Sequence, residues 1–95
     1  MAWYVAATGG KISSQRARFN VKVSPAAPLH RFALYYRVGT RWVRYGSSYM
    51  NLDLTGAGVA MYRTTSAGTK YIRITVPGDS THVAGNSRIF RITFP

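Results

Sequence analysis

Apolar and polar residues alternate with a period of two along most of this chain, and no stretch of ten or more residues places apolar side chains at helical spacing. In Arg16-Ala17-Arg18-Phe19, for example, the apolar side chains fall on odd positions, and the alternation continues to residue 23. Successive side chains of a β-strand point to opposite faces, so this pattern is typical of a strand with one buried and one wet face. The chain is therefore predicted to be all-β.

Seven or eight such segments follow one another at intervals of about ten residues, which is typical of a β-sandwich or a small barrel. Gly39-Thr40 separates two of them as a two-residue loop with glycine first, which predicts a type II′ hairpin. Prolines and small residues predict turns at residues 24–28 and 46–48. The predicted strands are residues 3–8, 16–23, 31–38, 41–45, 49–54, 59–63, 71–76 and 88–94.

Each predicted strand has one apolar face, which needs a partner sheet about 10 Å away. Ninety-five residues, 46% of them apolar, suit one small core, so residues 1–95 are predicted to form a single domain without membrane insertion. The chain has no cysteine, which leaves no disulfide framework and no thiol nucleophile. The first ten residues do not read as a secretory signal.

Positive charge dominates the composition. Thirteen lysines and arginines against Asp53 and Asp79 give a net charge of +11. Such a field attracts phosphates, anionic polymers or acidic protein surfaces. The alternative is that the charge serves solubility alone, and composition does not decide between the two.

The sequence offers little for catalysis or metal binding. Asp79, Ser80 and His82 are close in sequence, but neighbours in one loop seldom converge as a triad, and an Asx turn closed by Asp79 is the preferred interpretation. The remaining possible metal ligands, His30 and Asp53, lie in separate loops without ligand spacing. We expect no catalytic residue, no cofactor and no metal, and therefore no enzyme.

Arginine and tyrosine share the outward positions of several predicted strands. Tyr35 falls on the same face as Arg31 and Arg37, and the triplet Arg-Ile-Thr occurs twice, at residues 73–75 and 91–93. Exposed tyrosine interleaved with arginine is the composition of an interface hot spot, and also of ordinary cross-strand pairing on a wet sheet. Both interpretations stay open. The candidate partner-binding residues are Arg31, Tyr35, Arg37, Tyr71, Arg73, Arg88 and Arg91.

Residues 70–94 resemble the last hairpin of the bacterial immunoglobulin-like repeats found in surface proteins of actinobacteria and in their phages. The resemblance lies in an alternating strand, the loop Pro77-Gly78-Asp79-Ser80-Thr81-His82-Val83-Ala84, and a final alternating strand. Val23-Ser24-Pro25 is similar to the end of the family's second strand, and residues 36–42 to its central hairpin. The resemblance implies an immunoglobulin-like antiparallel β-sandwich with Trp42 packed in its core.

These observations lead to two functional hypotheses. The first is a non-catalytic structural or interaction module on a virion, as a capsid decoration or tail-associated protein, or on a cell surface. Its partner would be an acidic protein surface or an anionic glycopolymer, and an exposed N-terminal strand at residues 3–8 could also mediate self-association. The second hypothesis is nucleic-acid binding through a basic sheet face, although no known reader motif is present.

Overall fold

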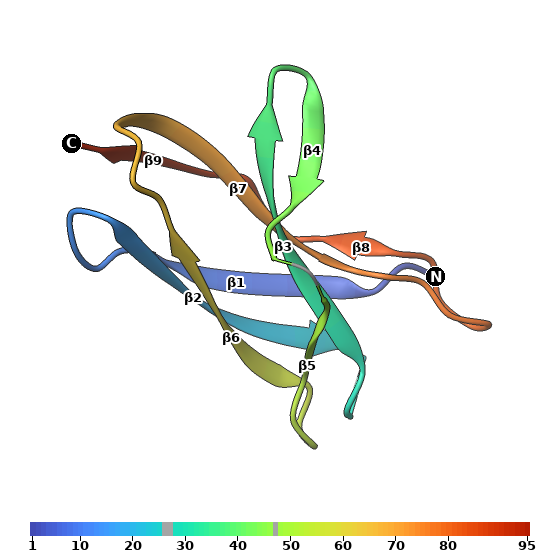
Figure 1. Ribbon diagram of the computed structural model, residues 1–95. Helices are drawn as coiled ribbons and strands as arrows, with labels where there is room; N and C mark the ends of the chain where they lie inside the picture. The colour runs from blue at the N-terminus through green and yellow to red at the C-terminus, as the bar shows by residue number, and fades with distance from the viewer. Residues whose placement is uncertain (26–27, 47) are drawn as a thin grey trace.

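The computed structural model describes residues 1–25, 28–46 and 48–95. These residues form two antiparallel sheets packed against each other, without a helix among them (Figure 1). The first sheet has the order β1-β2-β6, with β1 at Tyr4–Lys11, β2 at Arg16–Ser24 and β6 at Ala57–Arg63. The second sheet is built on β3 (Arg31–Val38) and β7 (Gly68–Val76), with β4 (Arg41–Arg44) and β5 (Met50–Asn51) beside β3 and β8 (Gly85–Asn86) and β9 (Phe90–Phe94) beside β7. The predicted antiparallel β-sandwich is confirmed, with nine strands among the described residues where seven or eight were expected.

The core lies between the two sheets and follows the period-two pattern. Alternate residues of β2 and of the second half of β7 are buried. Phe19 of the first sheet meets Phe90 of the second with ring centroids 4.8 Å apart, so the inner faces are in direct contact. Burying a side chain of this size contributes about 1.5–3 kcal/mol. The residues between these buried positions therefore point outward, where a partner can reach them.

The last predicted strand, residues 88–94, is shorter than expected, and a separate short strand that was not predicted lies before it. Only Phe90–Phe94 forms β9, and the separate strand β8 precedes it. Ser87 explains the break: its Oγ accepts a hydrogen bond from the amide of Ile74 at 2.9 Å and donates one to the carbonyl of Arg88 at 2.8 Å. A side-chain hydroxyl thus satisfies an amide that the backbone of a continuous strand would otherwise satisfy.

The predicted strand at residues 49–54 is also shorter than expected. Only Met50 and Asn51 pair with β3, and the chain then turns, with Leu52 buried in the core. The Oδ1 atom of Asp53 accepts hydrogen bonds from the amides of Thr55 and Ala57, which directs the chain into β6. The turns predicted at residues 24–28 and 46–48 include residues 26, 27 and 47, which lie outside the described part of the chain.

The hairpin between β3 and β4 matches its prediction. Val38 pairs with Arg41, which leaves Gly39 and Thr40 as the two loop residues. Gly39 has a φ of 64°, whereas Thr40 is not among the residues with positive φ, and this combination defines a type II′ turn. Figure 1 shows the tip of this hairpin projecting beyond the body of the sandwich.

Candidate interaction surface

The outer face of the second sheet collects arginine and aromatic side chains from four strands. Residues paired across neighbouring strands lie on the same face of a sheet. Tyr35 of β3 is paired with Arg73 of β7 on one side and with Arg44 of β4 on the other. We call this surface the arginine–aromatic face; it consists of Arg31, Arg37, Arg44, Arg73, Arg91, Tyr35, Trp42, Tyr49 and Tyr71.

Two arginines of this face stack on aromatic rings of other strands in the same sheet. The guanidinium carbon of Arg37 lies 4.1 Å from the ring centre of Tyr71, and that of Arg73 lies 4.3 Å from the ring centre of Trp42. Cations above an aromatic ring are attracted by its quadrupole. The Nε atom of Arg73 is buried and has no hydrogen-bond acceptor among the described residues. The aromatic rings therefore provide the contacts that hold these two guanidinium groups on the face.

A third stack is centred on Tyr49. The guanidinium carbons of Arg31 and Arg44 each lie 4.9 Å from its ring centre. The side chains of Tyr49 and Tyr35 share a hydrogen bond, which raises the pKa of Tyr35 and lowers the pKa of Tyr49. A hydrogen bond with Arg44 lowers the pKa of Tyr49 further. The charges of Arg31 and Arg44 act on the pKa of Tyr49 in the same direction as these hydrogen bonds, because a positive charge beside a phenol favours its anionic form.

The two acids of the chain are both engaged in loops elsewhere. Asp53 accepts hydrogen bonds from the amides of Thr55 (2.8 Å) and Ala57 (3.0 Å), between β5 and β6. Asp79 accepts one from the amide of Thr81 at 2.8 Å, in the loop after β7. The sequence contains no other acid. The arginine–aromatic face therefore carries five guanidinium groups and no carboxylate, so its potential is strongly positive.

Six of the seven predicted partner-binding residues lie on this face, and Arg88 does not. Arg88 precedes β9 and packs its guanidinium over the ring of Phe90 at 4.1 Å, beside the edge of β1. The prediction omitted three members of the face: Trp42, Arg44 and Tyr49. The hairpin register would have revealed the first two, because a two-residue loop after Val38 pairs Trp42 with Arg37. The six residues brought together are Arg31, Tyr35, Arg37, Tyr71, Arg73 and Arg91.

The resemblance to immunoglobulin-like repeats implied that Trp42 packs in the core, and this expectation is wrong. Trp42 is only half-buried and points outward with its partner Arg37. The buried tryptophan is Trp3, which is 6% exposed. Its ring stacks on that of His82 with centroids 3.8 Å apart, and the ring of His30 lies 5.1 Å away on centroids.

The loop from Asp79 to His82 is a structural turn. Asp79 Oδ1 accepts hydrogen bonds from the amides of Thr81 and His82, which confirms the predicted Asx turn and lowers the pKa of Asp79 to about 2. The Oγ1 atom of Thr81 lies 2.8 Å from His82 Nδ1. The hydroxyl bonded to the histidine is therefore that of Thr81 and not that of Ser80, the nucleophile of the triad considered above. The described residues contain no group of three or more potential metal-binding side chains. They also include no helix that could cross a membrane.

The N-terminal strand pairs within its own chain. β1 is antiparallel to β2 along its whole length, from Tyr4 opposite Ser24 to Lys11 opposite Ala17. Trp3, expected to be exposed, is instead buried at the start of this strand. Self-association through the N-terminal strand would have to use the other edge of β1, and it stays a prediction.

No family model matches the chain, and no curated protein matches it. The resemblance to bacterial immunoglobulin-like repeats thus rests on the sequence patterns given above. A sandwich of this kind hosts many unrelated functions, so fold alone does not assign one. The arginine–aromatic face is the feature from which a function can be argued.

Proposed function

We propose that this domain is a non-catalytic interaction module whose arginine–aromatic face docks onto an acidic protein surface. The observation that carries the proposal is the arrangement of five arginines and four aromatic residues on one sheet face, with both acids of the chain elsewhere. Arginine and aromatic residues are enriched at the energetic centres of protein interfaces. A face of positive charge is complementary to a surface rich in carboxylates.

The stacking geometry suits carboxylate recognition. The N–H edge of a guanidinium group can bind a carboxylate through two parallel hydrogen bonds. The guanidinium groups of Arg37 and Arg73 already lie over the rings of Tyr71 and Trp42 before any partner arrives. Because these side chains are already ordered, less conformational entropy is lost on binding.

The same stacks weigh against the nucleic-acid alternative. Single-stranded nucleic acid gains much of its affinity from bases stacked on exposed aromatic rings. Guanidinium groups already lie over Trp42, Tyr49 and Tyr71. Phosphate contacts by the arginines remain available, so nucleic-acid binding is the second candidate, and it would be electrostatic and strongly salt-dependent.

The setting that we propose is a virion surface, as a capsid decoration or tail-associated domain, or a bacterial cell surface. The resemblance of residues 70–94 to immunoglobulin-like repeats of such proteins supports this setting. An anionic glycopolymer of a cell wall would present the same negative charge to the face as an acidic protein does. The proposal commits to a protein partner because stacked arginines match the planar carboxylates of aspartate and glutamate.

The test uses two labelled probes, poly-glutamate and a random-sequence DNA duplex, titrated with the domain between about 50 and 200 mM salt. We expect poly-glutamate binding to persist at the higher salt and to weaken by about 2 kcal/mol in Tyr71→Ala, as at an interface hot spot. Arg73→Gln should weaken it as well. The control is Arg18→Gln, which removes an exposed arginine from β2 on the other sheet.

Three outcomes would decide the matter. If Tyr71→Ala and Arg73→Gln bind poly-glutamate as tightly as the Arg18→Gln control does, the arginine–aromatic face is not the binding surface and the proposal is refuted. If DNA binding persists at 200 mM salt and is lost in the two face variants, the partner of the arginine–aromatic face is nucleic acid and not an acidic protein. DNA affinity that falls by about a thousandfold over this range, as six or more phosphate contacts predict, would identify non-specific attraction and support the proposal.

A further inference from the structure

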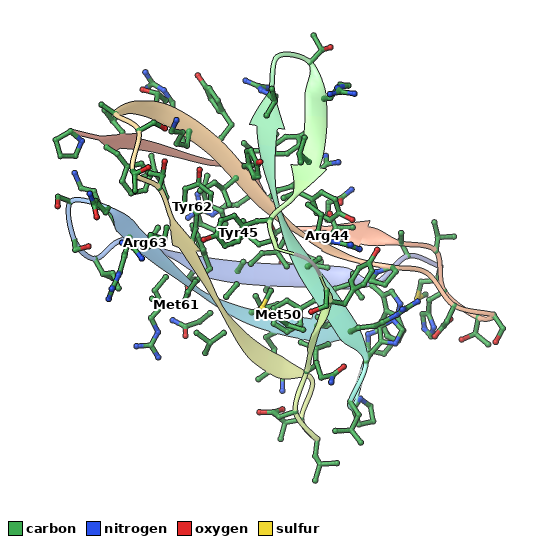
Figure 2. The ribbon with its side chains drawn as sticks, viewed as in Figure 1. Arg44, Tyr45, Met50, Met61, Tyr62 and Arg63 are labelled. Atoms are coloured by element: carbon green, nitrogen blue, oxygen red, sulfur yellow. The ribbon has the colours of Figure 1, made fainter. Side chains whose placement is uncertain are left out.

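A separate cleft of about 500 Å³ opens between the two sheets, where the connection from β6 to β7 faces the base of the β3–β4 hairpin. Its floor is made of three tyrosines, Tyr36, Tyr45 and Tyr62. The rings of Tyr45 and Tyr62 have centroids 4.9 Å apart, and Tyr36 lies 6.1 Å from Tyr62. Figure 2 shows Tyr45 and Tyr62 together in the space between the sheets.

The floor is made of aromatic rings and contains no carboxylate or ammonium group. Tyr62 is buried, and burial raises its pKa above the ordinary value. The hydroxyl of Tyr45 accepts a hydrogen bond from the amide of Arg63 at 3.2 Å and donates one to the carbonyl of Arg63 at 3.4 Å. This pair of bonds occupies the polar end of Tyr45 at the edge of β6 and leaves its ring facing the cleft.

The rim of the cleft is cationic. Arg63 at the end of β6 and Lys70 on β7 both line it. The Nζ atom of Lys70 donates a hydrogen bond to the hydroxyl of Ser66 at 2.9 Å, and the Ser66 hydroxyl is 3.1 Å from that of Thr64. These bonds hold the ammonium group and two hydroxyls together. Neither acid of the chain is among the lining residues, so every ionic group of the cleft is a cation.

We propose that this cleft binds a small organic anion that contains a ring. A carboxylate, sulfate or phosphate group would lie between Arg63 and Lys70 and accept hydrogen bonds from them. The ring, of a sugar or of an aromatic compound, would cover the tyrosine floor. The volume lies within the range of pockets that hold small ligands. The lining combines tyrosine rings with hydroxyl and cationic groups, so it can contact both the ring and the charged group of such a ligand.

The site is independent of the arginine–aromatic face in its chemistry. The face lies on the outside of the second sheet, whereas the cleft lies between the sheets. Among the residues of the face, only Arg37 also lines the cleft. Variants that leave Arg37 in place can therefore separate the two sites.

Binding is measured by calorimetry or by shifts of backbone amide resonances with four probes: inorganic phosphate, glucose, glucuronate and phenyl phosphate. We expect at least one of the two ring anions to bind at least tenfold tighter than both phosphate and glucose, because only a ring anion uses both the floor and the rim. Glucuronate as the tighter ligand would identify an anionic sugar, and phenyl phosphate an aromatic phosphate.

The double variant Arg63→Gln/Lys70→Gln should weaken the tighter ligand at least tenfold while Arg18→Gln leaves its affinity unchanged. Resonance shifts should centre on residues 63–70, and Tyr71→Ala should not affect them. Equal affinity for all four probes would overturn the proposal, as would a double variant that folds and binds like the control. Phosphate binding as tightly as phenyl phosphate and glucuronate would remove the ring from the proposal and refute it in this form.

Discussion

The two tryptophans give the sharpest test of how the sandwich is packed. Trp3 is 6% exposed, and burying an aromatic side chain of about 200 Å² at about 25 cal/mol per Å² contributes roughly 5 kcal/mol. Its Nε1 atom is buried without a hydrogen-bond partner among the described residues, which costs about 1–3 kcal/mol. The difference suggests that Trp3→Ala lowers the free energy of unfolding by about 3 kcal/mol.

Trp42→Ala should cost much less. This side chain is half-buried on the outer face, and its main contact is the stack with Arg73 at 4.3 Å. Such a pair contributes about 0.5–1 kcal/mol when it is exposed, so the expected loss is about 1 kcal/mol. Urea unfolding followed by far-ultraviolet circular dichroism measures both values. In thermal melts the two variants should differ by about 8–16 °C, since 1 kcal/mol shifts the midpoint of a domain of this size by about 4–8 °C.

Equal losses in the two variants, or a larger loss for Trp42→Ala, would place Trp42 in the core. The register of β4 against β3 would then be wrong, and the arginine–aromatic face would lose one of its stacks. A further variant, Trp3→Phe, keeps an aromatic ring and removes the unpaired N–H group. It should lose less than half of what Trp3→Ala loses, and a full loss would contradict the assignment of Nε1 as unpaired.

Two further predictions concern the backbone and pH. Gly9 has a φ of 145°, and a Cβ atom there would lie 2.0 Å from the carbonyl oxygen of Arg18, so Gly9→Ala should lower the free energy of unfolding by more than about 2 kcal/mol. A Cβ atom at Gly10 would meet nothing within 4 Å, so Gly10→Ala should change stability by less than about 0.5 kcal/mol. Similar urea midpoints for the two variants would contradict the β1–β2 geometry. The pKa of Asp79 is lowered from 3.8 to about 2, first by the amide of Thr81, so its contribution to stability is present above pH 4 and is lost as pH falls towards 2. Urea midpoints between pH 5 and 2 should fall less steeply in Asp79→Asn than in the wild type, and identical slopes would show that the turn does not depend on the charge.

The sequence predicted the fold class and much of the outward face because alternation is a local property. Arg31–Val38 has the boundaries expected for it, and the outward direction of Arg31, Tyr35 and Arg37 follows from counting by two. The Asx turn at Asp79 was equally accessible, since its partners lie two and three residues away. Each of these features is decided within a few residues of the chain.

Other features depended on contacts between distant segments. The break between β8 and β9 arises because Ser87 meets Ile74 across the sheet, which no local pattern reveals. Likewise, Trp3 is buried because its ring meets His82 near the other end of the chain. The local alternation of residues does not predict these contacts, because the topology of the whole domain determines which strands are neighbours.

The cleft shows the same division most clearly. Its tyrosine floor joins Tyr36 of the second sheet, Tyr62 of the first sheet and Tyr45, which follows β4. Its cationic rim depends on the path from β6 to β7. By itself, the sequence determined that this chain is a basic sandwich with outward arginines. Only the tertiary structure decided which arginine stacks on which ring and where the sheets part to leave a site, because side chains from separate strands meet only after the sheets have paired and packed.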